Sequence, residues 1–180
     1  MNCWKTIDLS KDYGFQRLFL YFIMASITAF IVLYLPLSLV DPSRKLAAGH
    51  ILYLAAILFL ILPLHKLLHA LPLMICGKIP KMKMEYAAMI PIVRLKPCAR
   101  ITKQVMLATL LSPFLIFTAA SIQASILMPE YVHYFCLAAA LHIGWCVPDL
   151  IYARQVIAAP RTCIVEEDRN ALEILIENKL

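Results

Sequence analysis

The chain has 180 residues, of which 62% are apolar and 16% are charged, and its mean hydropathy is +0.79. Soluble domains are about half apolar and about a quarter charged, so this composition excludes an ordinary soluble domain and predicts an integral membrane protein of one domain, residues 1–180. The net charge of +6 does not indicate nucleic-acid binding, because the basic residues flank apolar runs rather than alternating with aromatic residues.

Four apolar runs follow one another along the chain, at about residues 18–40, 46–76, 104–128 and 131–159. Each run exceeds the roughly 20 residues that an α-helix needs to cross a bilayer. We therefore expect an all-α membrane protein with four transmembrane helices. The first and third runs carry no charge, whereas the second and fourth contain ionisable residues. Ionisable groups within a membrane usually face the protein interior and mark functional sites, so the second and fourth helices are the predicted functional pair.

The basic residues are distributed unequally around these runs. Fourteen lie before the first run, between the second and third, or in and after the C-terminal end of the fourth, and only two lie between the first and second. The positive-inside rule then predicts a multi-pass protein of the cell membrane with the N- and C-termini and the long loop in the cytoplasm. The lipid bilayer is its expected partner.

The long loop between the second and third runs contains a pattern of period two. Charged residues alternate with Met82, Met84 and Tyr86, and a second apolar stretch at residues 90–93 precedes Arg94. This alternation predicts a short β-hairpin-like loop between helices 2 and 3. Such an edge could hold an extended substrate peptide by strand addition, with Met82, Met84 and Tyr86 as the candidate strand. A basic hairpin lying on lipid is an equally good interpretation.

Two histidines in the second run, His65 and His69, are four residues apart and therefore share one helical face, where both could bind one metal ion. Asp149 is expected at a similar depth in the fourth helix, and His142 and Cys146 share its face. Two histidines and one carboxylate would leave the fourth position of a zinc site open. The alternative is structural: the histidines bond neighbouring carbonyls and Asp149 pairs with a basic residue.

Several segments occur in an order that is typical of one known family. They are HKLLHA from His65, the alternating loop, TLLSPFLIF from Thr109, the pair Pro148-Asp149, and the tail CIVEEDRNALEILI. In this order and spacing the chain resembles the putative zincin peptidase family of bacterial membrane proteins, which is similar to site-2 proteases and has H-E-L-x-H-A within a span. The resemblance implies that His65, His69 and Asp149 are zinc ligands and that position 66 holds the general base.

Lys66 occupies that position in place of glutamate. A charged lysine has no lone pair with which to accept a proton, and hydrolysis needs a group that takes a proton from water. A +1 charge about 6 Å from a +2 ion, at an effective dielectric constant of about 20, costs on the order of 5 kcal/mol. We expect Lys66 to pair with a carboxylate such as Asp149, where zinc would otherwise bind.

These features predict a degenerate, inactive intramembrane zinc-metallopeptidase-like protein with a binding or regulatory role. Its partner would be a membrane protein or an extended peptide segment, and zinc would be either bound or absent. One alternative is an active zinc-dependent membrane peptidase in which burial makes Lys66 neutral, so that it can act as a base. The other is a non-enzymatic membrane scaffold or transport subunit.

Overall fold

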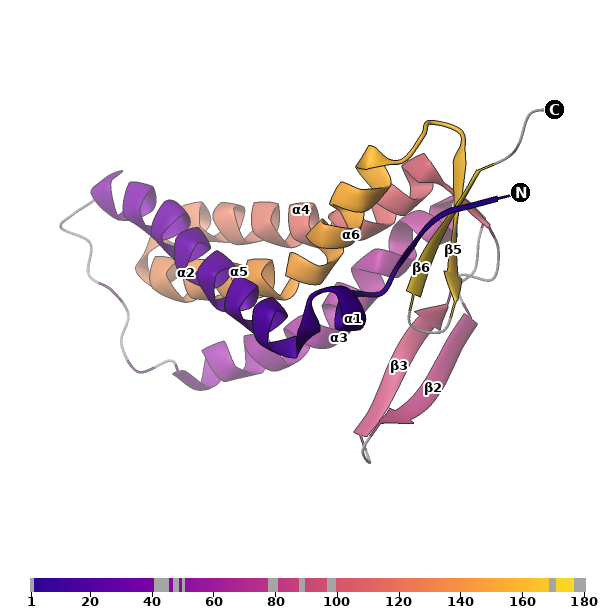
Figure 1. The fold of residues 1–180 in the computed structure, drawn as a ribbon. Coiled ribbons are helices and arrows are strands. Elements are labelled where there is room, and N and C mark those ends of the chain that lie inside the picture. The colour runs from indigo at the N-terminus through magenta and orange to yellow at the C-terminus, as the bar shows by residue number, and fades with distance from the viewer. Residues whose placement is uncertain are drawn as a thin grey trace. The chain divides into compact units, whose positions relative to one another are not determined.

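A computed structural model describes residues 2–40, 46, 49, 51–77, 81–87, 90–96, 100–168 and 171–176 (Figure 1). The chain is mostly helical and forms two compact units. We call the first the sheet unit, which comprises Met1–Asp12, Lys66–Ser112 and Asp149–Leu180. We call the second the helical unit, which comprises Tyr13–His65 and Pro113–Pro148. The single domain predicted from the sequence stays a prediction.

Three described helices are long and apolar enough to cross a membrane: α2 (Gly14–Val40), α3 (Ile51–Ile75, qualifying over Leu54–Ile75) and α4 (Lys103–Leu127). The predicted fourth span, residues 131–159, is a broken helix, because the 3-10 turn η1 (Pro129–Tyr131) and α5 (Val132–Trp145) are separated from α6 (Val147–Ala158) at Cys146. Pro148 explains the break, since it has no N–H for the carbonyl of Gly144 and its ring crowds that turn. By length and composition the described residues offer three candidate spans, or four if the broken pair counts as one.

Within the helical unit, α2 packs closely against α5 (Figure 1). The contact is made by small residues, Ser26 of α2 and Gly144 of α5, both buried. The rings of Phe22 and Trp145 meet edge to face beside them, with centroids 6.4 Å apart. Small residues let helix backbones approach closely, which is how transmembrane helices associate where burial of apolar surface from water gives no driving force.

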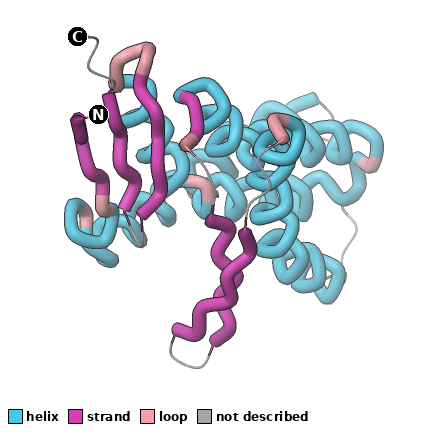
Figure 2. The backbone as a smooth tube through the Cα atoms, turned by 90° about the vertical axis from the view of Figure 1, so that its right-hand side faces the viewer, coloured by secondary structure: helices cyan, strands magenta, loops and turns pink. Residues whose placement is uncertain are grey.

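A four-stranded antiparallel sheet in the sheet unit corrects the all-α expectation (Figure 2). Its strand order is β1-β6-β5-β4, with β1 at Asn2–Ile7, β6 at Ala171–Ile176, β5 at Cys163–Asp168 and β4 at Ile101–Thr102. Leu172 and Ile174 are buried in β6 and alternate with less buried neighbours, as expected for a strand with one face on a core. The tail that follows α6 is therefore part of the fold.

The loop between α3 and α4 forms the predicted hairpin. Strand β2 (Lys81–Ala87) pairs antiparallel with β3 (Ile90–Lys96), and Lys81 lies opposite Lys96 (Figures 1 and 2). Met82, Met84 and Tyr86 all lie at alternate positions of β2. Among the described residues the hairpin is a separate two-stranded sheet.

Helix α6 carries Asp149 in its first turn, and side chains of other elements hold the rest of that helix. Lys103 donates hydrogen bonds from Nζ to the carbonyls of Ile157 and Ala159, at 2.9 and 2.6 Å. Lys5 of β1 donates to the side-chain oxygen of Gln155 at 2.9 Å. Carbonyls at a helix C-terminus lack helical partners, so a lysine there satisfies them and also interacts favourably with the helix dipole. These contacts fix the position from which Asp149 projects.

Candidate metal centre

His69 of α3 and Asp149 of α6 lie together in the sheet unit. The Nε2 atom of His69 is 3.4 Å from Oδ2 of Asp149, and each side chain is 18% exposed. Two ligands on one tetrahedral zinc ion, with bonds of about 2.0–2.1 Å, lie about 3.3–3.4 Å apart. The separation of these two atoms therefore fits two ligands of one ion.

The other ring nitrogen of His69 fixes the orientation of the imidazole. Nδ1 lies 2.7 Å from the carbonyl oxygen of Thr109. A carbonyl can only accept, so Nδ1 carries the hydrogen and donates it. Nε2 then faces the carboxylate of Asp149, and two acceptors at this distance need a proton or a cation between them. Metal-binding histidines are held in this way, with the second nitrogen donating to a carbonyl.

The carbonyl of Thr109 is available because of a proline four residues later. In an α-helix the N–H of residue 113 would bond to the carbonyl of residue 109, but Pro113 has no N–H. That carbonyl instead accepts from His69 and, at 3.1 Å, from the hydroxyl of Ser112. Proline is tolerated in a membrane helix when neighbouring groups satisfy the freed carbonyl in this manner.

Helix α3 shows the same arrangement with the roles of the two helices exchanged. Pro72 lies four residues after Leu68 in α3, so the carbonyl of Leu68 also lacks its helical donor. The hydroxyl of Ser112 donates to it at 2.8 Å, and the longer contact of this hydroxyl with the carbonyl of Thr109 shares the same hydrogen. In each helix a proline leaves one carbonyl without its helical donor, and a side chain of the other helix donates a hydrogen bond to that carbonyl. We call this reciprocal pair of hydrogen bonds the proline clasp.

Replacing Pro113 with alanine is expected to weaken metal binding at His69. The new backbone N–H would compete for the carbonyl of Thr109, and loss of such an orienting partner typically costs 10–100-fold in metal affinity. The measurement is a zinc dissociation constant, by competition with a chromophoric chelator, in a chain that also carries Lys66→Glu and Cys146→Ser. Pro36→Ala in α2 is the matched control, because that proline also lies inside a helix but is exposed and belongs to the helical unit. Equal zinc affinities in the two variants would contradict the role of the clasp.

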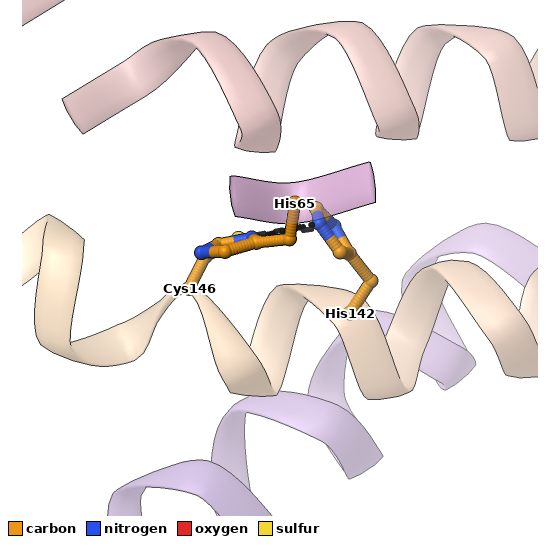
Figure 3. A group of neighbouring side chains, drawn as sticks. All are labelled: His65, His142 and Cys146. Atoms are coloured by element: carbon orange, nitrogen blue, oxygen red, sulfur yellow. Dashed lines mark hydrogen bonds between the residues drawn. The ribbon is translucent and has the colours of Figure 1, made fainter. Parts of the chain in front are cut away.

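His65 lies one helical turn before His69 in α3 but belongs to the helical unit, where it meets two other candidates (Figure 3). Its Nδ1 is 3.2 Å from Nε2 of His142 and 3.9 Å from Sγ of Cys146. All three side chains are buried, with residue exposures of 7% for His65, 1% for His142 and 0% for Cys146. The three form a group that could hold a metal ion.

Lys66 is half-buried in α3, between the two histidines in sequence. Its predicted pairing with Asp149 and its inactivating role stay predictions. Sequence reasoning identified the histidines, the aspartate and Cys146, but it assigned no role to Thr109, Ser112 or the prolines. The available signal was the same in both helices, namely a proline four residues after the residue whose carbonyl is used.

The fold and these donor groups define a class of protein: a mostly helical chain with three to four candidate membrane spans and with histidine- and carboxylate-containing groups that could hold a metal ion. The profile of the family described as putative zincin peptidase matches residues 58–164, which is more than half of the chain. The chain belongs to this family, and the resemblance seen in the sequence is confirmed. No curated protein and no solved structure matches the chain.

Proposed function

We propose that this chain is a zincin-family membrane protein that no longer hydrolyses peptides and instead binds an extended segment of a partner. The observation that carries the proposal is the contact between Nε2 of His69 and Oδ2 of Asp149, at 3.4 Å. It keeps the geometry of two zinc ligands in a chain whose general-base position is Lys66. Such a site supports metal ligation better than it supports proton transfer.

The proposed ligand set is His65, His69 and Asp149. His65 and His69 are four residues apart in one continuous helix, and Asp149 contacts the second of them. Zinc, when bound, would act as a Lewis acid on a peptide carbonyl. Peptide cleavage also needs a group that carries a proton from water to the leaving amine, and an ammonium group offers three donors and no acceptor. Lys66 therefore removes the proton carrier while the ligands remain.

The proposed binding element is the hairpin β2–β3. Within the described part of the chain its two strands pair only with each other, so each has a backbone edge to which a further strand can be added. Main-chain hydrogen bonds to such an edge bind extended peptides of many sequences, and alternate side chains such as Met82, Met84 and Tyr86 would select among them. A membrane protein with an extended segment close to the bilayer is the kind of partner that this arrangement suits.

The wild-type chain, purified in mild detergent with zinc present, is expected to show no chelator-sensitive cleavage of a fluorescent casein substrate. His69→Ala is the control, because it removes a proposed ligand and any zinc-dependent activity must disappear with it. Cleavage by the wild type that is abolished both by a chelator and by His69→Ala would contradict the proposal and identify an active peptidase.

A further inference from the structure

A second set of possible ligands lies in the helical unit and does not include His69 or Asp149. It consists of Nδ1 of His65, Nε2 of His142 and Sγ of Cys146, and the sides of this triangle are 3.2, 3.8 and 3.9 Å (Figure 3). Bonds of about 2.0–2.1 Å to nitrogen and about 2.3 Å to sulfur would place the nitrogens about 3.3–3.6 Å apart and nitrogen and sulfur about 3.6–3.8 Å apart. The triangle has the size of a three-ligand metal site. From these distances we infer that His65, His142 and Cys146 bind a thiophilic transition-metal ion of the zinc or copper class.

The local structure brings these groups together for identifiable reasons. His142 and Cys146 are four residues apart at the end of α5, so they share one helical face. The ring of Phe117 lies against His142, with centroids 4.3 Å apart. Sγ of Cys146 is 3.8 Å from Nε2 of His142 and 3.7 Å from Nδ1 of the same ring, so the thiol lies close to both ring nitrogens.

The charge of this ligand set distinguishes it from the set of His65, His69 and Asp149, which we call the zincin set. Only the thiolate form of cysteine binds a metal, and it contributes one negative charge to a site where every ligand is buried. A thiolate and two neutral imidazoles would neutralise a monovalent copper ion completely and a zinc ion by half. Buried charge is costly unless it is balanced. The thiolate of Cys146 balances part of the positive charge of the metal ion, whereas in the zincin set the positive charge of Lys66 offsets the negative charge of Asp149. Soft sulfur ligands also select copper(I) and zinc over magnesium or calcium.

The two sets share His65, so this inference is tested separately from the proposed function. The probe is cobalt(II), a spectroscopic substitute for zinc, added to the full-length chain in detergent. The expected result is one equivalent of bound cobalt with a thiolate-to-cobalt charge-transfer absorption in the near ultraviolet. Cys146→Ser is expected to abolish that absorption, and His142→Ala is expected to weaken binding at least tenfold. Addition of zinc or copper(I) should displace the cobalt, and the order of displacement tells which ion the site prefers.

Cys136→Ser is the matched control, because Cys136 is a second buried cysteine on α5 and lies outside the triangle. This variant, His69→Ala and Asp149→Asn should all keep the absorption. An absorption that survives in Cys146→Ser would overturn the inference, as would its absence from the wild type. Loss in His69→Ala and Asp149→Asn, but not in Cys146→Ser, would place the metal in the zincin set and would also overturn it. If Cys146→Ser does not fold, protection of Cys146 from alkylation by bound cobalt in the wild type decides, since an unprotected thiol contradicts ligation.

Discussion

Replacing Lys66 with glutamate is expected to raise bound zinc from below about 0.1 to about one ion per chain. The experiment uses a Cys146→Ser background, so that only the set of His65, His69 and Asp149 can bind. Removing a positive charge about 6 Å from a divalent ion relieves on the order of 5 kcal/mol, which corresponds to at least a thousandfold in affinity. Elemental analysis after gel filtration in detergent measures the zinc. The same variant is expected to acquire chelator-sensitive peptidase activity, because glutamate can accept a proton.

Lys66→Met separates the two effects of the substitution, since methionine removes the charge without supplying a base. It is expected to bind zinc without cleaving peptide. Adding His69→Ala to either variant should return the zinc content to the background. If both variants keep the elution volume and helical circular dichroism of the wild type and still bind no zinc, the three residues do not form a ligand set and the proposed function loses its basis.

Gly144→Ala is expected to destabilise the protein by about 1–3 kcal/mol, which is the opposite of its effect at an open helical position. A Cβ atom at Gly144 would overlap the hydroxyl of Ser26 and would lie 2.9 Å from the backbone oxygen of Phe22. The backbone oxygen cannot move without displacing α2, so the close contact of α2 and α5 must open. The measurement is the free energy of unfolding from a titration with sodium dodecyl sulfate in mixed micelles.

Ser26 provides the control for this prediction. Its buried hydroxyl has no hydrogen-bond partner among the described residues, so Ser26→Ala should change the free energy of unfolding by little. The double variant Ser26→Gly and Gly144→Ala should recover part of the loss, because the hydroxyl is gone while the contact with the Phe22 carbonyl remains. A Gly144→Ala protein as stable as the wild type, or more stable, would show that the two helices do not meet at this residue.

The fold was predictable from the sequence where one pattern dominates. Long apolar runs identified the helices α2, α3 and α4 to within a few residues, and period-two alternation identified the hairpin β2–β3. The four-stranded sheet was missed because its strands are short and its pairings join distant segments, such as Asn2 with Ile176. Alternation in ALEILI was visible, but a single strand of six residues does not reveal its partner. Hydropathy also could not show the break at Cys146, because the residues on both sides of it are apolar.

The sequence indicated which residues to consider for the candidate site, but it did not indicate which atoms of these residues contact one another. Helical spacing puts His65 and His69 on one face, yet the structure pairs His69 with Asp149 and His65 with His142. Which partner each imidazole meets depends on its rotamer and on which ring nitrogen donates, and spacing determines neither. The carbonyl of Thr109 belongs to the backbone, so no residue type marks it. Only its relation to Pro113 distinguishes it from the other carbonyls of α4.

The pairing of β1 with β6 has a consequence for the order in which the chain can acquire its structure. β1 is the first described element to be synthesised, and its partner β6 is the last. The pairing of Asn2 with Ile176 can therefore form only after β6 has been synthesised. Until then the backbone groups of β1 have no strand beside them, and an unpaired edge is prone to association with other chains. Translation would therefore leave the helices in place well before the sheet unit is complete. A chain that stops before residue 171 would keep its helices but would leave β1 and β5 without the strand that lies between them.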